Sequence, residues 1–252
     1  MANGYILCST PRSGSTLLCD LLTSTKQAGQ PNSFYRRQSI TEWAAWWGLP
    51  GRETMSAGAF DRLYLAAAVQ EGTAGTPIFG MRLMRENLEE LSDILDGLFP
   101  RLPSDCARLE QAFGPLVFIH LSRADKLAQA VSLIKAEQSG LWHVAPDGSE
   151  VERLAPPAEP QYDFKRIERE QAALTAFDRA WEVWFQKEGI SPLRVVYEEL
   201  ADDPAGTLAR LCQALGVQAP KPGDVKPGVA KLSDALSLDW MRRYHTDLSA
   251  NG

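Results

Sequence analysis

The chain has 252 residues, of which 44% are hydrophobic and 23% charged, a composition that suits one globular domain with a full apolar core. Its formal net charge of −6 argues against a protein that binds nucleic acid or membrane surfaces through a general positive charge. Any anionic ligand must therefore be held by a few arginines and by backbone N–H groups.

The first predicted elements are a buried strand at Tyr5–Cys8, a loop of small residues at Ser9–Thr16 and a helix at Leu17–Leu22. Such a strand–loop–helix unit suits a phosphate, because the N–H groups at the start of the helix lack partners and the helix dipole favours an anion. Helices also begin this way merely to pack closely on a sheet. The candidate anion ligands are Arg12, Ser13, Gly14, Ser15 and Thr16.

This loop differs from the P-loop of nucleotide triphosphatases, G-x-x-x-x-G-K-[ST]. With Gly14 on the second glycine, Ser9 falls on the first glycine and Ser15 on the lysine. The lysine that serves a magnesium triphosphate is thus missing, which disfavours a small-molecule kinase. The nearby cation is Arg12, which suits a phosphate ester with one anionic group to transfer.

A polar loop at residues 28–37 ends in Arg36 and Arg37 and leads into a short helix at residues 39–47. We expect Ser39 to cap this helix, with Glu42 completing a capping box. The helix carries three tryptophans, which either pack in the core or form a stacking wall for a sugar or lipid acceptor: Trp43, Trp46 and Trp47.

Two further buried strands are predicted, at Pro77–Met84 and at Leu116–Leu121. Arg82 lies inside the first of them and must be paired or face a ligand. Arg123 directly follows the second, and Ser132 lies on the next helix, predicted over Lys126–Trp142. Ligands of open α/β sheets bind at the carboxyl ends of strands, so Arg123 and Ser132 are expected to converge on one phosphate.

The remaining pattern completes one α/β domain over residues 1–252, with room for five or so parallel strands. Residues 143–161 form a loop whose length is typical of a lid or a dimer arm. The other predicted elements are helices at 60–69, 87–98, 163–187, 203–216 and 237–244 and a strand at 193–197.

Several motifs resemble those of sulfotransferases that use 3′-phosphoadenosine 5′-phosphosulfate (PAPS). Arg12–Thr16 is similar to their 5′-phosphosulfate loop, and Arg123 with Ser132 is similar to their 3′-phosphate site, although the gap from Arg123 to Asp125 is one residue longer than usual. With Gly80–Met84, Gln129–Ser132 and Asp239–Tyr244, the chain resembles the bacterial trehalose 2-sulfotransferase family. The resemblance implies a P-loop-like three-layer fold with a central mainly parallel sheet flanked by helices. It also implies a homodimer and transfer of a sulfuryl group from PAPS to a sugar hydroxyl without a metal.

The chain departs from this family where the general base is expected. The family has a glutamate at the position of Ser33 and another carboxylate at Gln30. A serine hydroxyl cannot usefully accept a proton near neutral pH, so another group must serve or positioning and charge must lower the barrier. Glu42 is the first candidate, although it is also the expected capping residue, whereas His120 reads as a core histidine. His143 adjoins the predicted loop boundary and is assigned no role.

The sequence leads to one preferred function and two alternatives. Arg12 neutralises charge as the sulfuryl group leaves, with Ser33 or Glu42 as the other catalytic candidates. Arg36 and Arg37 favour an anionic or lipid-linked carbohydrate or a glycolipid as the acceptor, and not trehalose. The alternatives are trehalose as the acceptor and a catalytically weakened protein that binds PAPS or its product, adenosine 3′,5′-bisphosphate (PAP).

The cysteines and the hydropathy pattern point to a cytoplasmic protein. Four cysteines lie far apart without metal-binding spacing, at Cys8, Cys19, Cys106 and Cys212, so neither a metal site nor a disulfide framework is expected. No apolar run reaches the roughly 18 residues of a transmembrane segment. We therefore expect no membrane span and no nucleic-acid partner.

Overall fold

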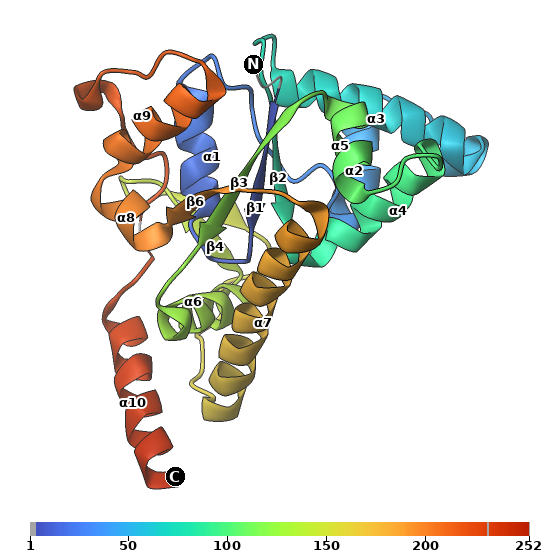
Figure 1. Cartoon of the computed structure of the whole chain (residues 1–252). Coiled ribbons are helices and arrows are strands. Elements are labelled where there is room, and N and C mark those ends of the chain that lie inside the picture. Colours follow the sequence, from blue (N-terminus) through green and yellow to red (C-terminus); the bar gives the residue numbers. More distant parts are fainter. Residues whose placement is uncertain (1–3, 231, 252) are drawn as a thin grey trace.

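A four-stranded parallel sheet with the order β2–β1–β3–β6 forms the centre of the computed structural model, which describes residues 4–230 and 232–251 (Figure 1). Its strands are β1 (Gly4–Ser9), β2 (Phe79–Met84), β3 (Leu116–Ser122) and β6 (Leu193–Val196). The predicted fold class is confirmed, with four parallel strands where the sequence suggested five or so.

The central strand β1 is enclosed on both faces, and all six of its residues are buried. Its register with both neighbours starts at Gly4, which lies opposite Phe79 of β2 and Leu116 of β3. A strand enclosed in this way reads as a continuous apolar run, which is why Tyr5–Cys8 could be recognised from the sequence.

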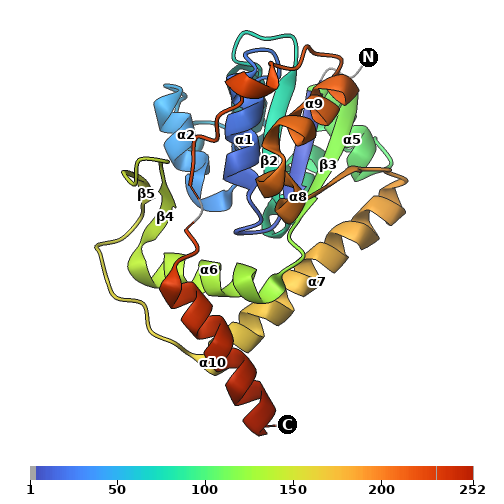
Figure 2. The same cartoon turned by 90° about the vertical axis from the view of Figure 1, so that its left-hand side faces the viewer.

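Two groups of helices cover the two faces of the sheet (Figures 1 and 2). Tyr5 and Leu7 pack against one group, whereas Ile6 and Cys8 pack against the other. The first group is α1 (Ser15–Ser24), α8 (Tyr197–Asp202) and α9 (Pro204–Leu215), and the second is α2 (Ile40–Trp46), α3 (Ala57–Thr73), α4 (Leu88–Leu98), α5 (Asp105–Phe113) and α7 (Phe164–Glu188). Because strand side chains alternate, each face has its own apolar core.

A third group of helices packs below the carboxyl ends of the strands. The helices α6 (Lys126–Ser139) and α10 (Ala235–Asn251) meet the first half of α7 through Val131, Ile167 and Trp240. In both views α10 projects from the rest of the fold (Figures 1 and 2). It is longer than the predicted helix at 237–244, and α5 was not predicted at all.

The segment after α6 differs from the prediction. The helix ends at Ser139 instead of Trp142, because Gly140 adopts a left-handed conformation with φ of 71°. A Cβ at Gly140 would lie 2.3 Å from the carbonyl oxygen of Ala155. The expected loop at 143–161 contains an antiparallel hairpin of β4 (Leu141–Val144) and β5 (Glu150–Arg153), seen at the edge of Figure 2.

The predicted capping box at Ser39 and Glu42 is wrong. A 3₁₀ helix, η1 (Arg37–Ser39), runs directly into α2, so Ser39 has a helical backbone and its side chain makes no capping hydrogen bond. Glu42 is exposed. The remaining 3₁₀ helices are η2 (Arg52–Thr54), η3 (Arg85–Asn87) and η4 (Pro222–Asp224).

The tryptophans of α2 form a stack, and two of them pack against the core, as the first of the two interpretations predicted. Trp43 stacks on Trp46 and Trp47, with ring centroids 5.4 and 5.2 Å apart. Trp43 and Trp47 pack against the core, whereas Trp46 is 79% exposed. The outer ring of the stack therefore faces solvent.

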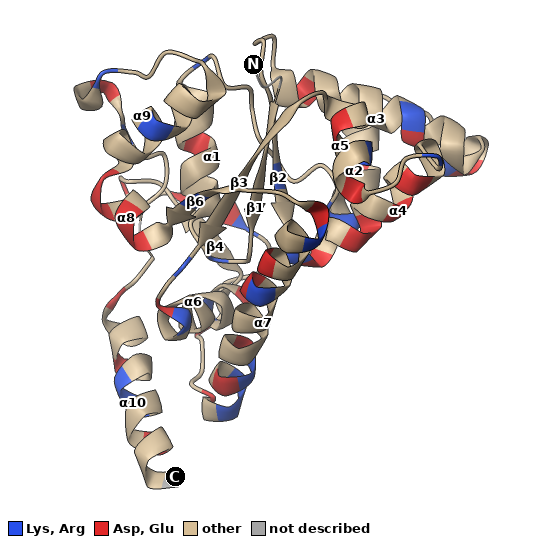
Figure 3. Ribbon diagram, in the orientation of Figure 1, with Lys and Arg blue, Asp and Glu red and all other residues tan. Residues whose placement is uncertain are grey.

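All charged residues of α4 and α8 are acidic, whereas acidic and basic residues are interspersed along α7 (Figure 3). Within the described residues, no helix combines the length and the hydropathy that a membrane span requires.

Candidate active site

A cavity of about 880 Å³ lies at the carboxyl ends of the strands. Its wall includes a residue that follows or ends each strand: Arg12 after β1, Met84 of β2, Arg123 after β3 and Tyr197 after β6. The β4–β5 hairpin and the connector to α10 (residues 225–230 and 232–234) complete the wall. The volume suits a ligand of nucleotide size.

The loop after β1 is held in a strained conformation. Arg12 has a φ of 60°, in the left-handed region that costs a non-glycine residue about 1–3 kcal/mol. Gly14 has a φ of 90°, and a Cβ there would lie 2.4 Å from Cδ2 of Tyr197. The hydroxyl of Ser13 is fully buried and has no hydrogen-bond partner among the described residues. Strain and an unpaired buried hydroxyl beside a helix N-terminus are features of a loop shaped for an anion.

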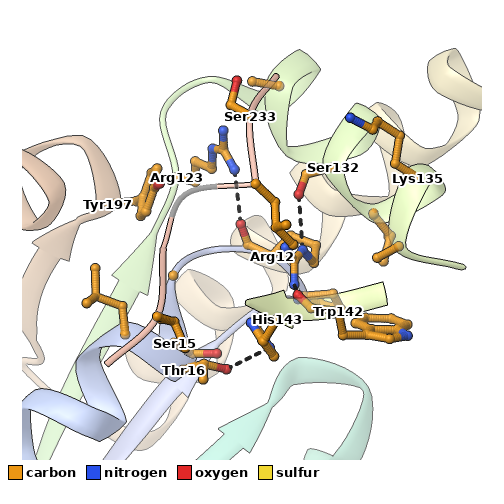
Figure 4. A pocket seen from close by; sticks show the side chains of 18 of the residues that line it. Arg12, Ser15, Thr16, Arg123, Ser132, Lys135, Trp142, His143, Tyr197 and Ser233 are labelled. Atoms are coloured by element: carbon orange, nitrogen blue, oxygen red, sulfur yellow. Dashed lines mark hydrogen bonds between the residues drawn. The ribbon is translucent and has the colours of Figure 1, made fainter. Parts of the chain in front are cut away.

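The Arg12 side chain turns toward α6 and β4 (Figure 4). Its Nε donates to Oγ of Ser132 over 3.1 Å, and its Nη1 donates to the carbonyl oxygen of Trp142 over 2.7 Å. Burial lowers the pKa of Arg12 to about 10, and the neighbouring charge of Arg123 acts in the same direction. A guanidinium that is destabilised by burial and by a second cation gains from an anion placed beside it.

Arg123 is fixed against the loop from the other side (Figure 4). Its Nη1 donates to the carbonyl oxygen of Arg12 over 3.3 Å, and its guanidinium carbon lies 4.7 Å from the ring centroid of Tyr197. The carboxylate of Glu198 lies 3.9 Å from Nε of Arg123 and accepts the N–H groups of Ala124 and Asp125. Burial lowers the pKa of Arg123. Both guanidinium groups thus belong to one cavity.

A buried polar network supports the loop from beneath, and sequence reasoning did not find it. Gln129 of α6 is fully buried and donates to Oγ1 of Thr10 over 3.0 Å and to the carbonyl oxygen of Pro11 over 2.7 Å. Lys126 donates to the side chains of Gln129 and Asp178. The network ties the loop to α6 and α7. A glutamine within an apolar helix face was the available signal.

A second cluster of polar side chains lies over β1 and β2. Asn32 forms a parallel β-bridge with Met81 of β2, in which its carbonyl oxygen accepts the N–H of Arg82. This contact places the next residue, Ser33, on the cavity wall. Arg82 donates from Nε to Oγ of Ser33 over 2.8 Å and from Nη1 to Oγ1 of Thr16 over 3.0 Å. The strand arginine is thus paired with two hydroxyls, and it lines the cavity.

His143 of β4 completes this cluster of polar side chains. Its Nε2 lies 3.0 Å from Oγ1 of Thr16 (Figure 4) and 3.4 Å from a carboxylate oxygen of Glu152. Burial lowers the pKa of His143 to about 4, and the charges of Arg12 and Arg82 act in the same direction. Sequence reasoning assigned His143 no role because it adjoins the predicted boundary of the loop at 143–161, and its neighbours Thr16 and Arg82 are distant in the chain.

Most of the sequence-derived candidates lie together. The cavity is lined by Arg12, Gly14, Ser15, Thr16, Ser33, Arg123 and Ser132, with Ser13 buried in the loop beneath. Glu42 and the three tryptophans are not among the lining residues. Arg36 lines the cavity, whereas Arg37 forms an ion pair with Glu90. His120 is a core histidine as expected, buried and 3.1 Å from a carboxylate oxygen of Glu182.

Comparisons with known proteins agree on one family. The model of the Stf0 sulphotransferase family matches residues 4–247. A trehalose 2-sulfotransferase of Mycolicibacterium smegmatis is 26% identical over 268 residues, covering 98% of this chain and 96% of the relative. The trehalose 2-sulfotransferase of Mycobacterium tuberculosis is 27% identical over 267 residues, covering 96% and 94%.

Two solved structures are also similar. The sulfotransferase domain of the Synechococcus PCC 7002 olefin synthase has a TM-score of 0.46 and 16% identity, covering 98% of this chain and 95% of that domain. The sulfotransferase domain of the curacin biosynthetic pathway has a TM-score of 0.49 and 14% identity, covering 98% and 97%. The match of the family model over nearly the whole sequence is the decisive finding: this chain is a sulfotransferase and belongs to the Stf0 sulphotransferase family.

Proposed function

We propose that this sulfotransferase takes its sulfuryl group from PAPS and transfers it to a hydroxyl of a carbohydrate or glycolipid. The observation that supports this most is that two guanidinium groups whose pKa values are lowered by burial, Arg12 and Arg123, lie on one cavity of nucleotide size. Two cations linked through the loop after β1 suit a ligand with an anionic group at each end.

The residues suggest which end of the donor binds where. The 5′-phosphosulfate is assigned to the loop of Arg12–Thr16, where first-turn N–H groups and the unpaired Ser13 hydroxyl suit an anion. The 3′-phosphate is assigned to Arg123 and Ser132. In this arrangement Arg12 neutralises the charge that develops on the leaving phosphate.

The acceptor is assigned to the side of the cavity above β2, where Ser33, Arg36 and Arg82 lie. The names of the two relatives make trehalose the first acceptor to test. Because Arg37 is paired with Glu90, Arg36 is the member of the arginine pair that remains on the cavity, which weakens the argument for a strongly anionic acceptor. Neutral and anionic glycans and glycolipids therefore belong in the same panel.

One set of measurements tests this function. PAP should bind without magnesium and ATP should bind poorly, as followed by isothermal titration calorimetry. Transfer from ³⁵S-labelled PAPS to trehalose, glycans and glycolipids then separates an enzyme with turnover from a protein that only binds the nucleotide. Failure of PAP to bind, or binding of ATP as tight as that of PAP, would contradict the proposal.

We also propose that the protein is a homodimer. Apolar side chains are exposed along the projecting helix α10, with Leu238 58% and Leu248 47% accessible. Light scattering coupled to size-exclusion chromatography should give twice the chain mass of 27.8 kDa. A mass that stays at one chain over the working concentration range would exclude the dimer.

A further inference from the structure

We propose that His143, with Glu152 beside it, accepts the proton of the acceptor hydroxyl. This inference rests on the proposed function and names the base that the chain lacks at Ser33. The Ser33 hydroxyl already accepts a hydrogen bond from Arg82, and Glu42 lies off the cavity. His143, by contrast, lines the cavity and contacts Thr16 through an imidazole nitrogen.

The position of His143 is set by the hairpin. His143 of β4 pairs with Glu152 of β5 at an irregular point of the hairpin, where the register shifts on both sides of His143, and the imidazole Nε2 lies 3.4 Å from a carboxylate oxygen of Glu152. The imidazole Nε2 points to Oγ1 of Thr16, the residue that also contacts Arg82. A proton acceptor must lie within about 2.6–3.2 Å of the oxygen it serves, and the Thr16 hydroxyl shows that Nε2 can hold an oxygen at 3.0 Å on this side of the cavity.

Three other carboxylates on the cavity wall already interact with cations. Glu137 is ion-paired with Arg166, and Asp234 is ion-paired with Lys135. Glu86 follows β2 and interacts with the charges of Arg36 and Arg85. These groups lie outside the cluster that joins the loop after β1 to β2, whereas His143 contacts that cluster directly.

The charges around His143 make its pKa depend on whether the donor is bound. The groups that face it are Arg12 and Thr16 from the loop and α1, Arg82 from β2 and Glu152 from β5. Burial and the two arginines disfavour the imidazolium, so the ring is neutral at pH 7 with a lone pair to use. An anionic donor between Arg12 and Arg82 compensates their charge and raises the pKa of His143 toward its ordinary value of about 6.5.

In the proposed step the acceptor hydroxyl is sulfated and gives up its proton to His143. The acceptor oxygen forms a bond to sulfur while the bond from sulfur to the 5′-phosphate oxygen breaks. The hydroxyl proton moves to Nε2 of His143, and the electron pair of the broken bond leaves with the phosphate of PAP. Glu152, whose side chain is 41% exposed, stabilises the imidazolium and leads toward solvent, where the proton is released. Neither an oxidant nor a metal is needed.

The first test uses binding without turnover. The chain has three histidines, so the imidazole signals can be followed individually by NMR as pH is varied. Saturating PAP should raise the pKa of His143 by at least one unit and leave the imidazole signals of the exposed His245 in place. Glu152→Gln should reduce this rise. A His143 pKa that stays fixed while PAP binds would overturn the inference without touching the proposed function.

The second test follows turnover. His143→Gln should lower kcat by about 10²–10⁴-fold, the usual contribution of a general base, with PAP affinity within threefold of the parent protein. Imidazole added to His143→Ala should restore part of kcat, and His245→Gln should behave as the parent. If His143→Gln keeps kcat within threefold, the base lies elsewhere. If the parent protein binds no PAP, the proposed function itself has failed.

Discussion

Gly14 and Tyr197 are in such close contact that no side chain fits between them: a Cβ on Gly14 would lie 2.4 Å from Cδ2 of the tyrosine ring. Gly14→Ala should therefore lower the free energy of unfolding by about 2–4 kcal/mol, combining a left-handed backbone with overpacking. It should also weaken PAP binding, because Tyr197 holds Arg123. Chemical denaturation and calorimetry measure the two effects.

Gly189→Ala is the matched control for this substitution. Gly189 has a φ of 67°, and a Cβ added there would meet no atom within 4 Å, so only the backbone cost of about 1–2 kcal/mol remains. PAP affinity should be unchanged. Equal losses of stability in the two variants would show that the contact with Tyr197 has no energetic role.

Arg12 and Arg123 are expected to contribute separately to donor binding. Arg12→Ala and Arg123→Ala should each weaken PAP by about 1.5–3 kcal/mol, roughly tenfold or more in Kd, because each removes charged hydrogen bonds from a desolvated site. Arg62→Ala, on the exposed side of α3, provides the control. If both cavity variants bind PAP as the parent does, the assignment of the two phosphates is wrong.

Gln129 should act on the loop without touching the ligand. Gln129→Leu keeps the approximate volume of the side chain but leaves the Pro11 carbonyl and the Thr10 hydroxyl without this buried donor, at a cost of about 1–3 kcal/mol in unfolding free energy. The affinity for PAP should fall as well, because the loop that loses these hydrogen bonds carries Arg12. Gln138→Leu, whose parent side chain accepts the N–H of Gln161 at the surface, should change neither quantity.

His143 should also make stability depend on pH. Its pKa lies near 4 in the folded protein and about 6.5 in the unfolded chain, so the unfolded state takes up the proton first as pH falls. The associated stability is present above pH 6.5 and is lost as pH drops toward 4, amounting to about 3 kcal/mol at most.

Comparison of the parent with His143→Gln isolates this contribution. Desolvation raises the pKa values of Asp20 and Glu86, so their protonation stabilises the folded state as pH falls and opposes the loss of stability caused by His143. Both carboxyls are present in the parent and in His143→Gln, so their contribution cancels in the comparison. Urea unfolding at pH 7, 5.5 and 4 should therefore show the difference between the two proteins shrinking as pH falls. A difference that does not vary with pH would mean that the ring is not buried as described.

The parts of the fold that could be predicted are those with local signals. Tyr5–Cys8 and Leu116–Leu121 are continuous apolar runs, and Arg123 could be placed on the cavity because ligands bind where parallel strands end. The β4–β5 hairpin was missed, since its short strands carry polar residues and face the cavity on one side. The capping box failed because η1 extends the backbone of α2 through Ser39.

The candidate site likewise consists of residues that a local sequence signal reveals and residues that only the fold brings together. The anion loop is contiguous in sequence, so Arg12–Thr16 could be selected together. The contacts of Thr16 with Arg82 and His143 join residues 66 and 127 positions apart, and no periodic pattern encodes such a meeting. Glu42 was chosen for its nearness along the chain, which is a poor guide to nearness in space.

The wall of the cavity draws on both ends of the described chain, with Pro11 and Arg12 near its start and Ser233 and Met241 near its finish. During synthesis, the anion loop leaves the ribosome long before the last of these wall segments. A nascent chain that lacks residues 233–241 therefore cannot close the complete wall of this cavity. Enclosure of a ligand on all sides therefore requires α10 to dock, although the proposed donor ligands Arg12, Arg123 and Ser132 lie earlier in the chain.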